Sequence, residues 1–113
     1  MVKISARTKL WLTANGKPLI GEGGYLLLKK IEEKGSLVKA AEELGVSYSF
    51  AWRYLQRVEK LLGKKVVESH RGGGERGSTS LTPEGRLLIQ LYEQARKLVE
   101  RSIEEFVKGA PEL

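Results

Sequence analysis

Residues 35–63 read GSLVKAAEELGVSYSFAWRYLQRVEKLLG, and this stretch decides the fold. Ser36 is a favourable N-cap for a short helix over residues 37–44, and Ser47 caps a longer helix that follows. Gly45 stands between them, where a tight turn needs a residue with conformational freedom. Two helices joined in this way predict a helix-turn-helix, whose second helix fits the DNA major groove. A helical hairpin inside another small bundle is the alternative for this stretch alone.

The second helix, residues 47–62, presents two different faces and is called the recognition helix below. Apolar residues recur on one face at spacings of 4, 3 and 4, namely Ala51, Leu55, Val58 and Leu62. The opposite face carries donors and no carboxylate, namely Ser49, Arg53, Gln56 and Lys60, with Arg57 beside them. Arginine pairs with guanine and glutamine with adenine, so this face favours DNA reading over a merely solvated charged surface.

The helix starts and the aromatic residues supply further candidates. The hydroxyls of Ser36 and Ser47 and the ring of Tyr48 stand at helix starts, and we count them as candidate DNA contacts. Two alternatives remain for Tyr48: its ring contacts a phosphate or a base, or it makes no contact with DNA. Trp52 is expected to pack beneath the recognition helix, because a large aromatic ring gains much from burial.

A glycine-rich stretch follows the recognition helix and predicts a wing over residues 70–79. It lies between two short runs that we expect to be strands, residues 65–69 and 79–81, and its glycines argue against regular structure within it. Arg71 and Arg76 flank the glycines, and we expect both to contact the DNA backbone or the minor groove. A nucleotide-binding loop would need a helix directly after it, whereas here a strand follows.

The amino-terminal segment predicts a β-hairpin and a first helix. Apolar residues alternate with polar ones from residue 3 to residue 12, which favours a half-buried strand. Asn15-Gly16 predicts a hairpin turn, and residues 18–20 a short return strand. A helix ending near Gly35 then follows, and the residues expected on its buried face are Tyr25, Leu27, Leu28 and Ile31.

The carboxyl-terminal part predicts a long helix that joins two copies. Thr82 is its expected N-cap, Pro83 its first helical residue, and apolar residues continue to about residue 108. We expect residues 83–113 to form a dimerisation helix with a tail, and residues 1–82 to form the winged helix-turn-helix domain. A helix that folds back over its own domain is the alternative. The residues expected at the seam between copies, at a coiled-coil-like spacing, are Leu88, Leu91, Ala95 and Leu98, with Phe106 further along.

The expected fold class is mainly α with a small β part (α+β), and the composition limits the functions that it can serve. The 20 basic and 14 acidic residues give a net charge of +6, and residues 1–20 and 46–80 each carry +4. Such clustering is typical of a phosphate-facing surface, although a solvated basic surface explains the charge equally well. With one histidine, no cysteine and no aspartate, we expect no enzyme, no metal site and no cofactor.

The expected partners are double-stranded DNA and a second copy of the chain. The sequence has no membrane-spanning apolar run and no signal-peptide pattern, so we expect no membrane contact and a cytoplasmic location. Two other functions remain open on the same fold, a sequence-indifferent architectural DNA-binding protein and a winged helix that binds protein. A regulator prefers its own site by about 10³ or more, and a protein-binding winged helix needs no carboxylate-free face.

Several motifs along the chain occur together in one family. They are Gly21-x-Gly23, Leu26-Leu27-Leu28, Gly35-Ser36 with Ala40-Ala41, Ser47-Tyr48-x-x-Ala51-Trp52, Gly63 with Val66-Val67-Glu68, the Arg-Gly-Gly-Gly of the wing, and Leu81-Thr82-Pro83-x-Gly85-Arg86. Over nearly its whole length, the chain resembles the amino-terminal DNA-binding domain of the molybdate-responsive (ModE) transcription regulators. It is similar, more distantly, to that of the LysR-type regulators. The resemblance implies a winged helix-turn-helix regulator of transcription.

Two features depart from the family pattern. A basic residue usually follows Gly-x-Gly in the family, whereas this chain has Gly24. The sequence stops at Leu113, before the molybdate-binding domain that the resemblance implies would follow. We therefore expect no molybdate sensing, and any small-molecule effector is unknown and would act through another surface.

Overall fold

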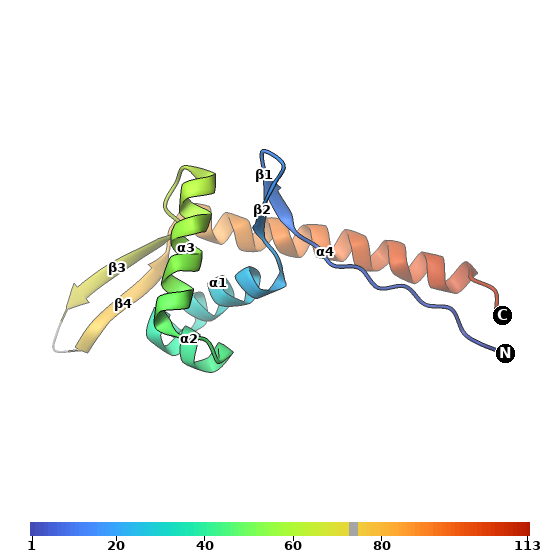
Figure 1. Cartoon of the computed structure of the whole chain (residues 1–113), viewed down its shortest axis with the longest axis horizontal. Helices are drawn as coiled ribbons and strands as arrows, with labels where there is room; N and C mark the ends of the chain where they lie inside the picture. Colours follow the sequence, from blue (N-terminus) through green and yellow to red (C-terminus); the bar gives the residue numbers. More distant parts are fainter. Residues whose placement is uncertain (73–74) are drawn as a thin grey trace.

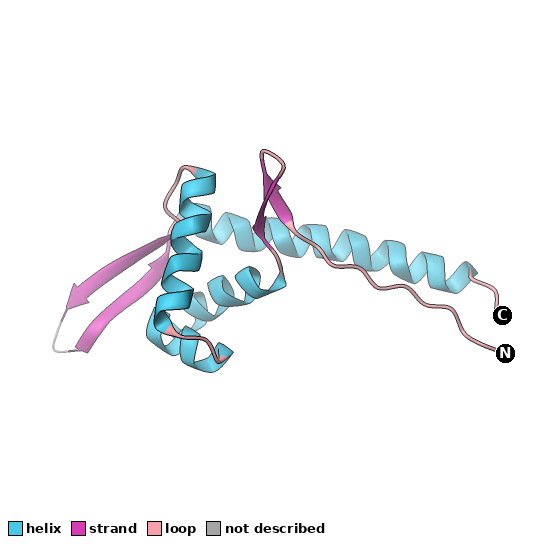
Figure 2. Cartoon of the chain, viewed as in Figure 1, coloured by secondary structure: helices cyan, strands magenta, loops and turns pink. Residues whose placement is uncertain are grey.

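The computed structural model describes the backbone of residues 1–72 and 75–113 and the side chains of residues 1–70 and 77–113. Four helices and two antiparallel hairpins form a winged helix-turn-helix, which confirms the α+β class (Figures 1 and 2). The elements are β1 (Leu12–Ala14), β2 (Lys17–Ile20), α1 (Glu22–Lys34), α2 (Leu37–Leu44), α3 (Tyr48–Leu62), β3 (Val67–Gly72), β4 (Glu75–Leu81) and α4 (Pro83–Gly109).

The helix boundaries follow from capping residues, as the sequence predicts. At the start of α2, α3 and α4, a hydroxyl oxygen accepts a backbone N–H three residues further on; the capping residues are Ser36, Ser47 and Thr82. The first three helices end at glycines in the left-handed conformation, Gly35, Gly45 and Gly63, with φ of 65°, 70° and 72°. Capping alone therefore places the turn between α2 and α3.

The core lies where α1, α2, α3 and the first turns of α4 meet. Leu28 and Ile31 of α1 are almost fully buried at its centre. The predicted inner faces of α1 and α3 are confirmed, except that Leu62 is only half-buried. Three apolar residues of α4 join this core, namely Leu88, Ile89 and Tyr92.

The prediction of a strand over residues 3–12 is wrong. Residues 1–11 form an extended segment, called the N-terminal arm below, and the first strand begins only at Leu12. The arm lies along α4 (Figure 1), where Val2 and Leu113 exchange backbone hydrogen bonds and the Tyr92 hydroxyl donates to the Leu10 carbonyl. Its alternation therefore reflects one-sided packing on a helix, not pairing with a strand. The hairpin turn itself is confirmed, with positive φ at Asn15 and Gly16.

The wing contains more regular structure than the sequence predicts. β3 extends to Gly72 and β4 begins at Glu75, with Gly72 opposite Glu75 and Val67 opposite Leu81. The glycines predict irregular structure over residues 70–78. A two-stranded ribbon is held by backbone hydrogen bonds, so glycine weakens it without preventing it.

The long helix α4 combines both readings of its sequence. Its first turns pack on the body of the same chain, and Leu88 is only 4% exposed. Leu88 therefore belongs to the domain's own core, and its assignment to a seam between copies is wrong. The remaining length of α4 leaves the body and runs beside the arm (Figure 1). Among the helices that the structure describes, none has the length and apolar character that a membrane span needs.

Candidate nucleic-acid interface

The outer face of α3 is polar and open to solvent. Its exposed residues are Ser49, Arg53, Gln56 and Lys60, the same set that the sequence singles out. Ala51, Leu55 and Val58 on the opposite side are buried, so packing fixes which way the helix faces. The donors consequently point away from the domain, where a nucleic acid can reach them.

Glu59, the one acid of α3, is turned away from this face. Its carboxylate accepts hydrogen bonds from the backbone N–H groups of Val66 and Val67, at 2.8 and 3.4 Å. It also lies 3.9 Å from the Lys65 ammonium, and its side chain is 15% exposed. Glu59 thus fastens the start of β3 to α3, and the outer face keeps a single sign of charge.

Arg57 does not lie where the sequence analysis expects a DNA contact. Its guanidinium donates to the carbonyls of Pro18 and Leu19, at 3.0 and 3.2 Å, and lies 5.1 Å from the centre of the Tyr54 ring. These contacts hold the β1–β2 hairpin against the flank of α3. The sequence gives no sign of this role, because the hairpin is 38 residues away along the chain.

Gly24 and Tyr54 form a matched pair at the joint between α1 and α3. A Cβ on Gly24 would overlap the Tyr54 hydroxyl and come within 2.8 and 2.9 Å of ring atoms Cζ and Cε1. Burial raises the pKa of Tyr54, against a smaller opposing effect of Arg57. Gly24, the position that departs from the family pattern, therefore provides the space that the Tyr54 ring fills.

A cleft of about 530 Å³ separates the helix-turn-helix from the wing. Its polar lining consists of Ser36 at the N-cap of α2, Tyr48 of α3, Ser69 and His70 of β3, and Ser78 and Thr79 of β4. Ser36 and Ser47 use their oxygens as caps for the Lys39 and Phe50 N–H groups, so their O–H protons are left to donate. Tyr48 stands 49% exposed at the edge of this cleft.

Thr79 fixes the wing to the helix-turn-helix and is a positioning residue that the sequence analysis missed. Its side-chain oxygen accepts the Leu37 N–H at 3.3 Å, and its own N–H donates to the Gly35 carbonyl at 3.0 Å. Its place as a small β-branched residue in a predicted strand was visible, but its pairing with the start of α2 was not. The side chains of Arg71 and Arg76 lie outside the described residues.

Trp52 is exposed, not packed beneath α3. The ring is 44% exposed, because residue 52 follows Tyr48 by four positions and so shares its flank of the helix. Ala51 and Leu55 occupy the buried stripe instead. The two rings place aromatic surface beside the polar face of α3.

An apolar stripe remains exposed along α4. Leu87, Leu91, Leu98 and Phe106 are 50%, 42%, 64% and 53% exposed, and Ala95 between them is half-buried. At about 100° per residue, Leu87, Leu91 and Leu98 lie within about 40° of one another and on the side of the helix away from Ile89, whereas Phe106 projects in the direction of Leu88 but on the part of α4 beyond the body. Four of the five residues expected at the seam are therefore accessible to a partner.

Comparison with known proteins agrees with this geometry. Residues 25–86 match the family described as bacterial regulatory helix-turn-helix protein, lysR family. The chain is 38% identical over 78 residues to the transcriptional regulator ModE of Haemophilus influenzae. It is 38% identical over 90 residues to the molybdenum-pterin-binding protein MopB of Rhodobacter capsulatus. It is 33% identical over 78 residues to the DNA-binding transcriptional dual regulator ModE of Escherichia coli K12.

These matches cover 69%, 80% and 69% of this chain but only 29%, 33% and 30% of the relatives, so it spans about a third of their length. Among solved structures, the CbnR_DBD–DNA complex is similar with a TM-score of 0.60 and 24% identity, over 79% of this chain and 97% of that one. The BenM_DBD/benA site 1 DNA complex is similar with a TM-score of 0.58 and 24% identity, over 78% and 96%.

Proposed function

The chain belongs to the bacterial regulatory helix-turn-helix proteins of the lysR family, and from this premise we propose that it is a transcriptional regulator that binds specific duplex DNA sequences. The observation that carries the proposal is the outer face of α3, where four donors stand exposed and the only carboxylate of the helix is tied to β3. Such a face suits a phosphate-lined groove and suits few other partners.

We assign separate tasks to the helix and to its surroundings. Arg53 and Gln56 stand in the middle of α3 and read base edges in the major groove. The surrounding donors hold the sugar–phosphate backbone, and the wing arginines reach the backbone or the minor groove. The residues given these backbone contacts are Ser36, Ser47, Tyr48, Ser49, Lys60, Arg71 and Arg76.

The same proposal gives the exposed stripe of α4 to a second copy of the chain. An apolar stripe of this length on a surface otherwise rich in charge promotes association. Pairing two α4 helices covers Leu91, Ala95, Leu98 and Phe106, and it creates a two-fold axis that suits two half-sites. Residues 1–82 then act as the DNA-binding domain and residues 83–113 as the dimerisation helix with its tail. The dimer acts in the cytoplasm, where a bacterial chromosome lies, and we assign it no catalytic role.

Selection of bound duplexes from a random-sequence pool tests this function. We expect enrichment of one two-fold symmetric motif, bound about 10³ times more tightly than random DNA of the same length. Tight binding with no enriched motif would identify a sequence-indifferent architectural protein instead. Absence of binding at low salt would leave the α3 face to a protein partner and refute the proposal.

A further inference from the structure

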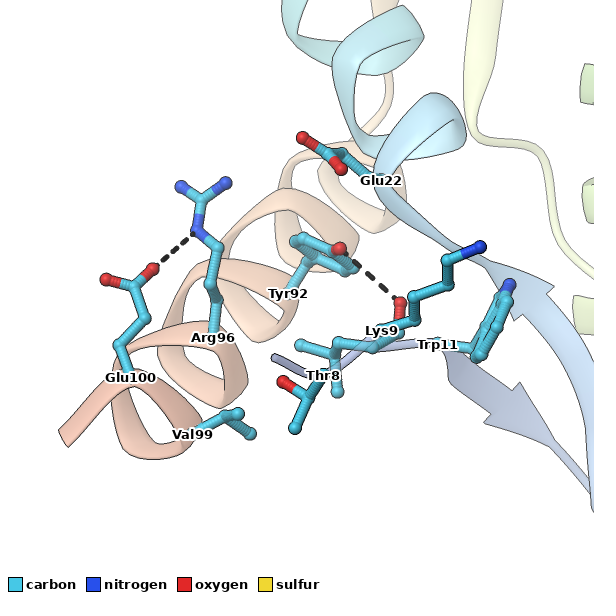
Figure 3. Close-up of a pocket in the computed structure, with 9 residues that line it drawn as sticks. Thr8, Lys9, Trp11, Glu22, Tyr92, Arg96, Val99 and Glu100 are labelled. Atoms are coloured by element: carbon cyan, nitrogen blue, oxygen red, sulfur yellow. Dashed lines mark hydrogen bonds and ion pairs between the residues drawn. The ribbon is translucent and has the colours of Figure 1, made fainter. Parts of the chain in front are cut away.

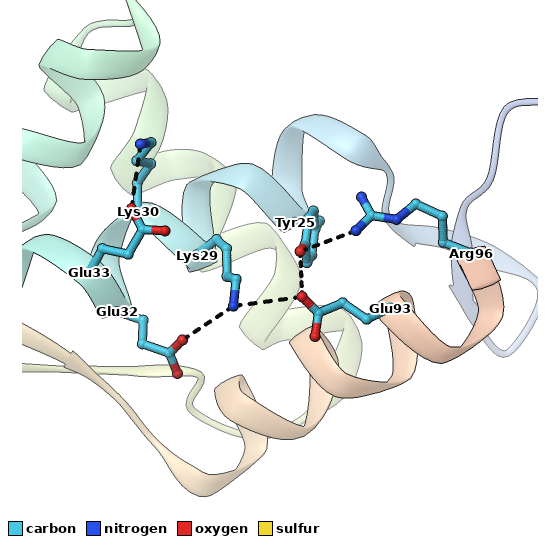
Figure 4. Close-up of polar contacts among 7 residues, drawn as sticks. All are labelled: Tyr25, Lys29, Lys30, Glu32, Glu33, Glu93 and Arg96. Carbon is cyan, nitrogen blue, oxygen red and sulfur yellow. Dashed lines mark hydrogen bonds and ion pairs between the residues drawn. The ribbon is translucent and has the colours of Figure 1, made fainter.

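The joint between α1 and α4 is built from a stacked and hydrogen-bonded cluster of five residues, four of which, Tyr25, Lys29, Glu93 and Arg96, are drawn in Figure 4. The tyrosine–arginine cluster consists of Tyr25 and Lys29 of α1 and Tyr92, Glu93 and Arg96 of α4. The rings of Tyr25 and Tyr92 stack with their centres 4.8 Å apart and their planes 17° apart. The Arg96 guanidinium lies 4.8 Å from the centre of the Tyr25 ring and 5.8 Å from that of Tyr92. Stacking of this kind restricts both the separation and the tilt of the two helices.

Directional polar contacts add to the stack. The Tyr25 hydroxyl donates to Glu93 at 2.5 Å, and Arg96 donates to the same hydroxyl at 3.4 Å. Lys29 lies 3.6 Å from Glu93. The hydrogen bond from Tyr25 is the main reason that the pKa of Glu93 lies below its ordinary value, with Lys29 and Arg96 acting in the same direction. The carboxylate is thus held in one place by α1.

The cluster occupies the point where α4 leaves the body of the domain. Towards the start of the helix, Leu88 and Ile89 are in the core. Beyond Arg96, α4 has the N-terminal arm and the C-terminal tail beside it, and both line a cleft with Phe106. Arg96 pairs with Glu100 at 3.6 Å, and both line a cleft whose other wall includes Thr8 and Lys9 of the arm (Figure 3). The cluster is therefore the fulcrum of the projecting part of α4.

A fulcrum in this position amplifies small changes of angle. From Tyr92 to Phe106 the helix advances about 21 Å, so a tilt of about 10° at the cluster displaces Phe106 by roughly 4 Å. One base pair added between two half-sites moves them by about 3.4 Å and turns them by about 35° relative to each other. A tilt of this size at the cluster is thus comparable in translation, though not in rotation, to one base pair at the DNA.

We propose that the tyrosine–arginine cluster sets the angle between α4 and the DNA-binding domain and so determines the half-site spacing that the dimer accepts. The proposal deepens the function proposed above and rests on it. An apolar pair at Tyr25 and Arg96 would fill the same joint, but it would not fix one orientation, because hydrogen bonds and stacking are directional while apolar contacts are not. These five side chains act as positioning residues, at a distance from the DNA.

The variants that test this role are Tyr25→Phe, which keeps the ring, and Tyr25→Phe combined with Arg96→Met. Lys97→Met is the matched control, because Lys97 is the next residue on α4, is exposed and forms no ion pair with a described residue. Each variant is compared with the wild-type full chain on the selected motif with its half-sites moved by one, two or three base pairs. We expect the wild type to lose about tenfold in affinity for each added base pair, since the duplex or the dimer must deform. The double variant should lose less than about threefold in affinity for each added base pair. Its affinity for a single half-site and the mass of its dimer should stay unchanged.

A second measurement reads the angle without DNA. The chain has no cysteine, so Lys39→Cys in α2 and Lys108→Cys in α4 accept one spin label each. Excess unlabelled protein ensures that the two labels measured lie within one protomer. The distribution of distances between the labels should widen by roughly 4 Å in the double variant and stay narrow in Lys97→Met. Where the double variant does not fold by circular dichroism, Tyr25→Phe should show the same changes to a smaller extent.

The outcomes separate the two proposals. Unchanged spacing preference and unchanged distance width in a folded cluster variant would overturn the role of the cluster. If the wild type binds no DNA and the cluster variant still shows a broader distance distribution than the wild type, the role of the joint is retained and only the proposed function is refuted. Equal affinity of the wild type for all the half-site spacings would also overturn the inference.

Discussion

The helices α3 and α4 are packed in the same way but differ in the chemistry of their exposed residues. Each buries one apolar face in a shared core, through Ala51 and Leu55 in α3 and through Leu88 and Ile89 in α4. The outer face of α3 then carries donors and no acid, whereas α4 exposes a stripe of leucines and a phenylalanine between charged residues. Packing of the core does not require these outer residues, so their chemistry indicates what each face binds. The face of α3 suits a polyanion, and the stripe of α4 suits a second apolar surface.

The first prediction tests the α3 side with salt. If the dimer neutralises six to ten phosphates, its affinity for duplex DNA should fall by about 10³ to 10⁵ between 50 and 200 mM salt, because bound counterions are released. Fluorescence anisotropy titrations across that range measure the slope. Dimer mass over the same range is the internal control, since apolar contacts do not weaken with salt. An affinity that does not change with salt would show that α3 does not bind a polyanion.

The second prediction breaks the α4 side with charge. Leu98→Glu with Phe106→Glu should give a folded monomer, since both side chains are more than half exposed and lie outside the core. Loss of the second binding domain should weaken binding to a two-half-site duplex by about 10² to 10⁴. Sedimentation velocity and anisotropy measure the two effects, and Lys97→Glu with Lys108→Glu on the polar side of α4 is the control. A wild-type protein that sediments as a monomer at micromolar concentration would contradict the prediction.

The third prediction sharpens what the α3 face does. Arg53→Ala should cost about 1–3 kcal/mol on the selected motif and relax the preference at one base pair, because a bidentate contact to a base is lost. Arg76→Ala is the matched change in the wing and should weaken all duplexes by the same factor. Selection from a random pool with each variant gives the preferences. Uniform weakening by both variants would show that α3 holds the backbone and reads no base.

Local rules recovered most of the fold because the decisive residues act over short distances. Ser36, Ser47 and Thr82 cap helices three residues away, and glycines end them, so sequence spacing alone locates α2, α3 and α4. The buried faces of α1 and α3 follow from periodicity in the same way. Sequence spacing therefore predicts well the features that the residues of a single helix determine, such as its ends and its buried face.

Three of the errors concern contacts between distant segments. Arg57 looks like one more donor on α3 until the hairpin, 38 residues earlier, occupies its guanidinium. Leu88 fits a seam until the body of the domain covers it, and the arm alternates like a strand although a helix lies beside it. For Leu88 and the arm the pattern correctly indicated one-sided burial, and for Arg57 it correctly indicated a donor; in none of the three could the sequence identify the partner.

The fourth prediction concerns the joint between α1 and α3. Gly24→Ala should destabilise the fold by about 1–3 kcal/mol, because the added methyl overlaps the Tyr54 ring in a packed interface. Gly23→Ala is a close control, since nothing lies within 4 Å of a Cβ at that position, and there the same change should stabilise the helix by about 0.5–1 kcal/mol. Thermal unfolding measures both. Tyr54→Leu should restore part of the loss in Gly24→Ala, and absence of any rescue would show that the ring is not the cause.

The last prediction concerns the other joint of α1, with α4, and has the smallest effect. The pKa of Glu93 is lowered in the folded chain, chiefly by the Tyr25 hydroxyl, so the unfolded chain binds a proton more readily. Glu93 therefore stabilises the fold above its unfolded pKa, and this contribution is lost as the pH falls through the folded pKa. Because the side chain is 34% exposed and water screens it, we expect a loss below about 1 kcal/mol between about pH 6 and about pH 3. Urea unfolding of Glu93→Gln should show a shallower decline across that interval than the wild type, whereas Glu104→Gln, on the exposed part of α4, should retain the wild-type decline. Equal declines in all three proteins would mean that Glu93 keeps its ordinary affinity for protons and adds nothing pH-dependent to the contact between α1 and α4.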